Sequence, residues 1–182
     1  LGLSDEAFLQ QAVEKLKSLP EPYYAFLVTL TSHGPFNFEG IPHVLDLGSL
    51  EGTEMADYLN AVHYTDQAIG HFLQRLKAEG ILDNAVLVVY GDHFGVNRYT
   101  PGFMEFMEIS QGDEFILQHL ERRIPFMIRL PNGEAAGEQP QVAGQVDIAP
   151  TLAGLLGIPT EDTYFMGRDL LANPEGIVAF YT

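Results

Sequence analysis

The hydrophobic pattern at the start of the chain predicts a helix followed by a buried strand. Between residues 4 and 18, apolar side chains recur at the three- and four-residue spacing of an amphipathic helix, and Ser4 stands where a helix cap is expected. Two prolines end this pattern. Residues 23–30 then form a continuously apolar, β-prone run, which is typical of a strand covered on both faces. A loop that contains His33 follows.

A long helix and a second strand come next. Apolar residues recur at helical spacing over residues 54–79, and Gly80 is a suitable helix stop. Residues 85–90 form another apolar run. Strand, helix and strand in this order make the βαβ unit of a parallel sheet, whose functional residues lie in loops beyond the carboxyl ends of the strands. We therefore predict an α/β fold, with a mostly parallel sheet flanked by helices.

The rest of the chain predicts shorter elements. In order, these are an interrupted helix at 102–120, a strand at 125–130, a surface loop at 131–144, a helix capped by Asp147 and extending to Leu156, and a strand at 177–181. No repeat or linker divides them. Residues 1–182 are therefore expected to form part of a single domain.

Composition narrows the possible partners and ligands. The 25 acidic and 9 basic residues give a formal charge of −16, which disfavours binding to nucleic acid. The chain has no cysteine, so any metal must be held by oxygen and imidazole groups. No apolar run approaches the roughly 20 residues that span a bilayer. The first residues include neither an initiator Met nor a basic region, which leads us to expect a piece of a longer polypeptide.

The clearest candidates for chemistry follow the two predicted strands. Asp92 and His93 leave the second strand together, and both can coordinate a divalent ion. Gly91 and Gly95 flank them and would let backbone and metal approach closely. The alternative is a loop turn with a hydrogen-bonded histidine. His33 follows the first strand and would face this pair, contacting an anionic substrate or the ion, unless it is a loop histidine bonded to backbone.

Other polar residues have weaker claims. Asp66 is in register with Val62, Ile69 and Leu73 on the apolar face of the long helix, so we interpret it as a buried structural anchor rather than a catalytic group. Three arginines flank a later strand and are candidates for phosphate binding, although isolated arginines are usually surface residues: Arg122, Arg123 and Arg129. Four histidines lie in a loop or on helices and are not assigned a role: His43, His63, His71 and His119.

Five blocks in a fixed order carry a family resemblance. They are 30–36 (LTSHGPF), 64–70 (YTDQAIG), 89–95 (VYGDHFG), 144–152 (GQVDIAPTL) with 156–158 (LGI), and 166–171 (MGRDLL). From about residue 24 to its end, the chain resembles the lipoteichoic acid synthase and phosphoglycerol transferase branch of the sulfatase-like (alkaline phosphatase) superfamily. The resemblance implies an alkaline phosphatase/sulfatase-like fold and places the chain in the C-terminal part of the catalytic domain.

The resemblance also implies site roles. Asp92 and His93 match two ligands of a single Mn²⁺ or Mg²⁺ ion, and His33 matches a histidine that contacts the phosphoglycerol group. The family's Glu ligand and Thr nucleophile lie upstream, and residues 1–23 do not contain them in a recognisable form. The chain alone is therefore expected to be inactive. The family often has Tyr where this chain has Phe94, so a hydroxyl available to the substrate is missing.

The activity that the resemblance implies is transfer of phosphoglycerol from a phospholipid to a glycerol or glycan acceptor, through a phospho-threonine intermediate. It further implies a membrane protein with N-terminal helices outside this chain and a catalytic domain on the extracellular or periplasmic side. Two alternatives remain. One is a sulfatase or phosphodiesterase of the same superfamily, in which water replaces the acceptor, and the other is a noncatalytic glycolipid-binding module without a divalent ion.

Overall fold

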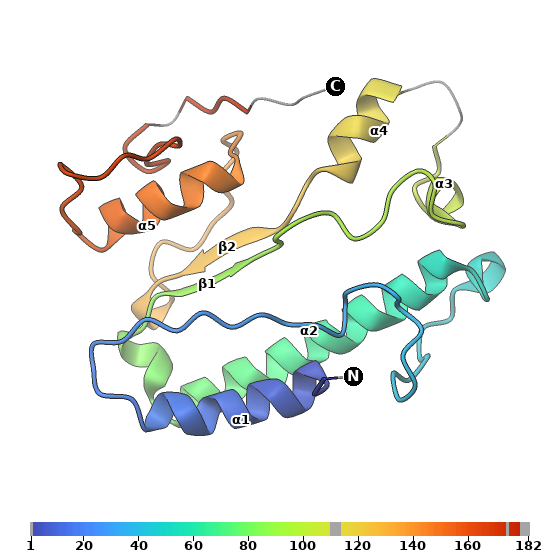
Figure 1. The fold of residues 1–182 in the computed structure, drawn as a ribbon, viewed down its shortest axis with the longest axis horizontal. Coiled ribbons are helices and arrows are strands. Elements are labelled where there is room, and N and C mark those ends of the chain that lie inside the picture. Colours follow the sequence, from blue (N-terminus) through green and yellow to red (C-terminus); the bar gives the residue numbers. More distant parts are fainter. Residues whose placement is uncertain (1, 110–113, 174, 179–182) are drawn as a thin grey trace. The chain divides into compact units, whose positions relative to one another are not determined.

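The computed structural model describes residues 2–109, 114–173 and 175–178. The chain divides into two compact units, Leu1–Glu134 and Ala135–Thr182. The first contains α1 (Asp5–Lys17), α2 (Glu54–Ala78), β1 (Leu87–Tyr90), α3 (Phe103–Phe106), α4 (Glu114–Glu121) and β2 (Phe126–Arg129), with 3₁₀ turns at Gly48–Leu50, Ile81–Asn84 and Pro131–Gly133 (Figure 1). The second contains a 3₁₀ turn at Gln145–Asp147 and α5 (Ile148–Leu155). That they form a single domain stays a prediction.

Local capping explains where the two long helices begin and end. The Ser4 hydroxyl accepts a hydrogen bond from the Ala7 amide at the start of α1, and Thr53 caps α2 in the same way. Gly80 follows α2 with φ 73°, a left-handed conformation that glycine adopts without strain. The predictions for these two helices are therefore confirmed to within two residues.

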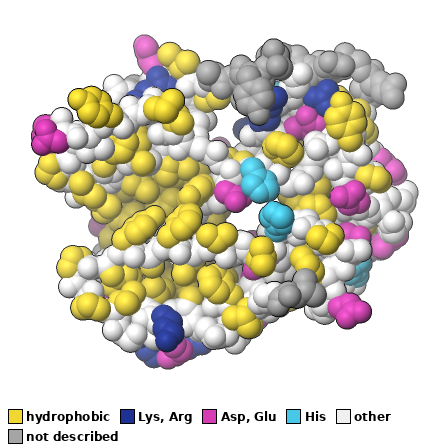
Figure 2. Space-filling view, viewed as in Figure 1, with side chains coloured by type: hydrophobic (Ala, Val, Ile, Leu, Met, Phe, Trp, Pro, Cys, Tyr) yellow, Lys and Arg dark blue, Asp and Glu magenta, His cyan; other side chains and the backbone are white. Residues whose placement is uncertain are grey.

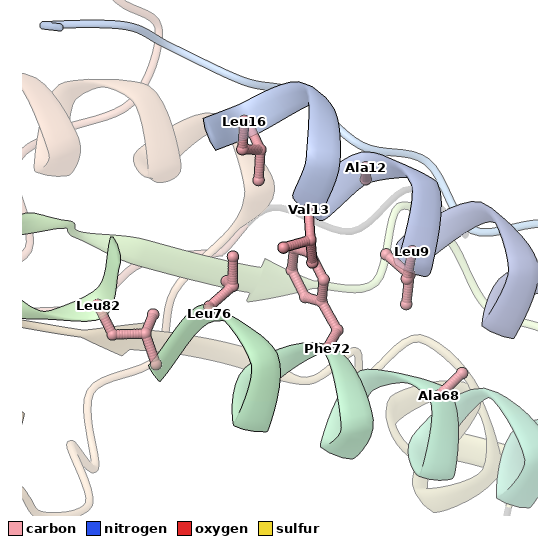
Figure 3. Close-up of a cluster of buried hydrophobic side chains, with 8 residues drawn as sticks. All are labelled: Leu9, Ala12, Val13, Leu16, Ala68, Phe72, Leu76 and Leu82. Atoms are coloured by element: carbon pink, nitrogen blue, oxygen red, sulfur yellow. The ribbon is translucent and has the colours of Figure 1, made fainter. Parts of the chain in front are cut away.

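α1 and α2 lie side by side and run in the same direction (Figure 1). Their facing sides bury one apolar cluster, in which Val13 points onto the ring of Phe72 (Figure 3). The cluster consists of Leu9, Ala12, Val13, Leu16, Ala68, Phe72, Leu76 and Leu82. Burial of each large side chain contributes about 1.5–3 kcal/mol, so this cluster is a main source of stability in the first unit. Every helix in the described part of the chain is too short or too polar to cross a membrane.

The described sheet is a pair of strands. β1 and β2 are antiparallel, with Leu87 opposite Arg129 and Tyr90 opposite Phe126, so the parallel pairing predicted for the strands on either side of α2 is not found among the described residues. The predicted first strand, residues 23–30, is extended, but among the described residues it has no place in a ladder. Two of its residues, Tyr23 and Leu27, pack against the α1–α2 cluster. Side chains of the opposite face are exposed: Tyr24, Phe26, Val28 and Leu30. The predicted strand at 177–181 falls largely outside the described residues.

A second apolar cluster lies around the first half of α2. It joins that helix to the segment after His33 and to the segment after His93. Its buried members are Phe36, Met55, Ala61, Val96, Phe103 and Leu117, and Tyr58 packs against them. The two loops that carry the predicted site residues therefore rest on the same helix.

The second unit is held together by buried polar groups. The Asp147 carboxylate accepts hydrogen bonds from the amides of Gly144 and Arg168, both at 2.9 Å. The Thr151 hydroxyl donates to the Asp147 carbonyl and accepts from the Leu170 amide. Asp147 precedes α5 as predicted, but its side chain does not cap the helix. Its carboxylate joins two sequence blocks that lie about 20 residues apart.

Candidate functional site

Three predicted site residues meet in the first unit. Asp92 and His93 lie in the loop after β1, with 3.7 Å between the Asp92 Oδ1 and His93 Nε2 atoms. The ring of His33 stands edge-on to that of His93, with 6.0 Å between the ring centroids. Figure 2 shows histidine side chains beside an acidic side chain on the surface in this view. The side chains of Asp92 and His93 are 76% and 56% exposed, so a ligand can reach them.

Backbone carbonyls determine which ring nitrogen of each imidazole carries a proton. His93 Nδ1 lies 2.6 Å from the Phe94 carbonyl oxygen, and His33 Nδ1 lies 2.9 Å from that of Gly34. A carbonyl only accepts hydrogen bonds, so each Nδ1 must carry the proton. In the neutral ring, Nε2 then has a free lone pair for a metal ion or a proton. A histidine bonded to backbone, which was the predicted alternative, can therefore also bind a metal ion or a substrate.

The donor atoms of Asp92 and His93 are close enough to share one metal ion. With ligand distances of about 2.1 Å, an ion can bind two donor atoms up to roughly 4.2 Å apart, and the observed separation is 3.7 Å. The described residues contain no group of three or more acidic, His or Cys side chains that could hold a metal ion. Asp92 and His93 would thus supply part of a coordination shell.

Two glycines let the loop of Asp92 and His93 pack closely. The Gly91 amide donates to the Pro125 carbonyl at 3.0 Å, and a Cβ at Gly91 would lie 3.1 Å from the Ile124 Cβ. A Cβ at Gly95 would lie only 2.6 Å from the Tyr58 ring. A side chain at position 95 would force the Tyr58 ring to move, because a Cβ at that distance overlaps it.

A buried carboxylate that the sequence did not reveal holds the loop of His33. Asp5 is 1% exposed, and its Oδ1 atom accepts hydrogen bonds from the amides of Leu30 and Thr31. Its Oδ2 accepts from the Thr65 hydroxyl at 2.7 Å. The Leu30 carbonyl in turn accepts from the His33 amide. Asp5 therefore fastens the turn of His33 to both long helices.

The structure corrects the interpretation of Asp66. Asp66 is exposed, whereas its neighbour Thr65 is 7% exposed and faces α1. The buried side of α2 contains Ala61, Thr65, Ala68 and Phe72 rather than the residues in register with Asp66. The expected anchor beneath the loop exists, but Asp5 provides it.

Comparisons with known proteins decide the family. The sequence profile described as Sulfatase matches residues 1–158, which is most of the chain. The chain belongs to the sulfatase family. Lipoteichoic acid synthase-like YvgJ of Bacillus subtilis is 37% identical over 177 residues, covering 94% of this chain and 28% of that protein.

Solved structures agree with this family. The crystal structure of the lipoteichoic acid synthase LtaP from Listeria monocytogenes matches with a TM-score of 0.76 and 34% identity, over 94% of this chain and 43% of that one. A protein in the alkaline phosphatase superfamily from Vibrio parahaemolyticus, at 24% identity and a TM-score of 0.67, shares the fold. The predicted resemblance and the predicted alkaline phosphatase/sulfatase-like α/β class are confirmed. The chain spans about a quarter of the length of the curated relatives it matches.

An ion pair fixes the far end of the Asp92–His93 loop in this sulfatase-family chain. The Glu121 carboxylate accepts hydrogen bonds from Nε and Nη2 of Arg98, and the two side chains are only 11% and 17% exposed. Burial alone would raise the pKa of Glu121, but the hydrogen bonds and charge of Arg98 outweigh it and hold this pKa below its usual range. Because the pKa is lower in the folded state, the stabilisation is present above the unfolded-state pKa and is lost as pH falls through the folded value.

We therefore expect Glu121→Gln to destabilise the protein by about 1–3 kcal/mol at pH 7. The difference from wild type should begin to shrink as the pH falls through the unfolded-state pKa of glutamate, about 4.3, and should disappear below the lowered folded-state pKa. Urea unfolding at several pH values measures both effects. Glu161→Gln, at an exposed position, serves as the control. A difference that stays constant down to pH 3 would contradict the ion-pair account.

The remaining candidates have structural partners. Arg129 donates to the carbonyls of Leu82 and Leu130, so it stabilises backbone near β2. His71 contacts the Glu6 carboxylate at 3.0 Å, and His43 lies 3.7 Å from Asp57. These contacts favour structural roles for Arg129, His43 and His71.

Proposed function

We propose that this chain is part of a metal-dependent phosphoglycerol transferase. The donor is a phospholipid such as phosphatidylglycerol, and the acceptor is a glycerol or glycan hydroxyl. The observation that carries the proposal is the meeting of His33, Asp92 and His93 in one exposed site. Similarity to the lipoteichoic acid synthase LtaP supports transfer as the reaction class.

Asp92 and His93 would hold a Mn²⁺ or Mg²⁺ ion through Oδ1 and Nε2. When bound, this ion would lower the pKa of a hydroxyl nucleophile and neutralise charge on the phosphoryl oxygens. The hydrogen bond from His93 Nδ1 to the Phe94 carbonyl orients the ring for this role. The corresponding bond from His33 Nδ1 to Gly34 leaves Nε2 of His33 to orient the phosphoglycerol group or to protonate the outgoing group.

The proposed reaction has two balanced steps. A threonine oxygen first bonds to phosphorus while the bond from phosphorus to the diacylglycerol oxygen breaks, and diacylglycerol leaves with a proton. The oxygen of an acceptor hydroxyl then bonds to phosphorus while the bond from phosphorus to the threonine oxygen breaks, and the acceptor's proton passes to the threonine oxygen. We propose that this threonine, the remaining Glu ligand and the membrane-spanning helices belong to polypeptide outside residues 1–182. Catalysis would then take place on the extracellular or periplasmic side, and the chain alone would be inactive.

The reaction products identify the acceptor. Phe94 is 50% exposed beside His93, with 6.4 Å between the ring centroids, so its ring borders the proposed site without offering a hydroxyl. If water replaces the acceptor, the products are diacylglycerol and free glycerol phosphate. If a glycerol hydroxyl is the acceptor, the product is a glycerol phosphate polymer.

The test uses the intact protein with phosphatidylglycerol vesicles and Mn²⁺. We expect metal-dependent release of diacylglycerol together with a glycerol phosphate polymer. His33→Gln should lower the rate about 10²–10⁴-fold, whereas His71→Gln, an exposed histidine on α2, should not. Release of free glycerol phosphate without polymer would show that the enzyme is a hydrolase and not a transferase. Absence of diacylglycerol release, or release that survives chelation, would refute the proposal.

A further inference from the structure

Tyr58 of α2 lies between the two loops of the candidate site. Its ring meets that of Phe36 with 5.0 Å between centroids and an angle of 70°. On another side, the ring approaches the Gly95 backbone so closely that an added Cβ would lie 2.6 Å from Tyr58 Cε2 and 3.1 Å from the hydroxyl oxygen. Phe36 follows His33 by three residues, and Gly95 follows His93 by two.

Packing makes this arrangement resistant to deformation. Phe36 and Val96 are 7% and 9% exposed and belong to the same apolar cluster, so each loop is held against α2 just beyond its histidine. A tyrosine ring is rigid and has few rotatable bonds. Protein interiors are close-packed and transmit strain. The space between the two loops is therefore set by a side chain of fixed dimensions.

We propose that Tyr58 is a positioning residue that sets the distance between His33 and His93. It acts through Phe36 on one loop and through Gly95 on the other, and it does not touch the substrate. The consequence for catalysis rests on the proposed transferase function, because there the two histidines act on the same phosphoryl group. The claim that Tyr58 sets the distance between the two rings rests only on its contacts with Phe36 and Gly95.

The first test compares three variants of the intact protein in phosphatidylglycerol turnover. Tyr58→Leu should lower kcat about 10–100-fold with little change in KM, because displacement of catalytic groups by about 1 Å has effects of this size. Tyr58→Phe keeps the ring and should remain near wild type. Phe72→Leu, on the same helix but in the other apolar cluster, should reduce stability without a comparable loss of kcat.

The second test is a double-mutant cycle between Tyr58 and Gly95. Gly95→Ala should lower kcat in the wild-type background because its Cβ would overlap the Tyr58 ring. In the Tyr58→Leu background, the same substitution should cost less than a third as much, since the smaller side chain leaves room for the methyl group. Multiplicative effects of the two substitutions would overturn the claim that Tyr58 and Gly95 are a fitted pair.

Crystal structures of the variants separate this proposal from the proposed function. The 6.0 Å separation of the His33 and His93 rings should change in Tyr58→Leu and persist in Tyr58→Phe and Phe72→Leu. If wild type releases no diacylglycerol, the transferase is refuted, while the ring separation still decides the role of Tyr58. Should Tyr58→Leu fail to fold, Gly95→Ala displaces the loop from the other side. An unchanged separation in the variant that folds would overturn the proposal.

Discussion

Asp92→Ala in the intact protein is expected to abolish phosphoglycerol transfer and to leave the fold largely unchanged. The Asp92 side chain is 76% exposed, so its removal should alter the free energy of unfolding by less than about 0.5 kcal/mol. The same change removes one of two atoms proposed to hold the ion, and a metal-dependent reaction would lose at least about 10³-fold in rate. Diacylglycerol release and urea unfolding measure the two effects separately.

Metal content provides a check that does not depend on activity. Purified Asp92→Ala should retain less bound Mn²⁺ than wild type after dialysis, as measured by elemental analysis. Asp66→Ala is a suitable control, because Asp66 is an exposed aspartate of the same unit. Wild-type turnover by Asp92→Ala would show that Asp92 does not hold the ion. Equal Mn²⁺ content in Asp92→Ala and Asp66→Ala would lead to the same conclusion.

The elements of this fold that can be predicted from sequence have local causes. The caps at Ser4 and Thr53 and the stop at Gly80 act within a few residues, so the bounds of α1 and α2 follow from the sequence. The meeting of His33 with Asp92 and His93 was also predicted, because each residue was placed in a loop at the end of an apolar run, although the parallel strand pairing assumed in that prediction is not found among the described residues. This part of the site did not require any knowledge of side-chain contacts.

The elements that could not be predicted depend on distant partners. The long helix α2 has apolar residues on more than one side, so its sequence does not decide whether Thr65 or Asp66 faces α1. Strand pairing is equally nonlocal, and residues 23–30 have strand composition without a ladder in the described structure. Asp5 was hidden for a related reason. An acidic residue in the first turn of a helix is usually explained by the helix dipole, and that explanation gives no sign of its partners 25 to 60 residues away.

The contacts of Asp5 predict a large effect on stability. Asp5→Ala would leave the amides of Leu30 and Thr31 and the hydroxyl of Thr65 without their present acceptor. Each unsatisfied buried donor costs about 1–3 kcal/mol, reduced where water can enter. We expect a loss of about 3–4 kcal/mol in the free energy of unfolding, which is a substantial part of the 5–15 kcal/mol typical of a domain.

Asp5→Asn distinguishes lost hydrogen bonds from lost packing. The asparagine carbonyl oxygen can still accept from the two amides, and the Thr65 hydroxyl can turn to accept from the new NH₂ group, so a cost of only about 1–2 kcal/mol is expected. Urea unfolding of both variants measures this order, with Asp66→Ala as an exposed control expected within about 0.5 kcal/mol of wild type. The Leu30 carbonyl also accepts a hydrogen bond from the His33 amide, so loss of Asp5 should displace His33. Asp5→Ala should therefore reduce turnover even at temperatures where the variant remains folded. A loss of less than 1 kcal/mol in Asp5→Ala, or equal losses in both Asp5 variants, would show that this network does not hold the His33 turn.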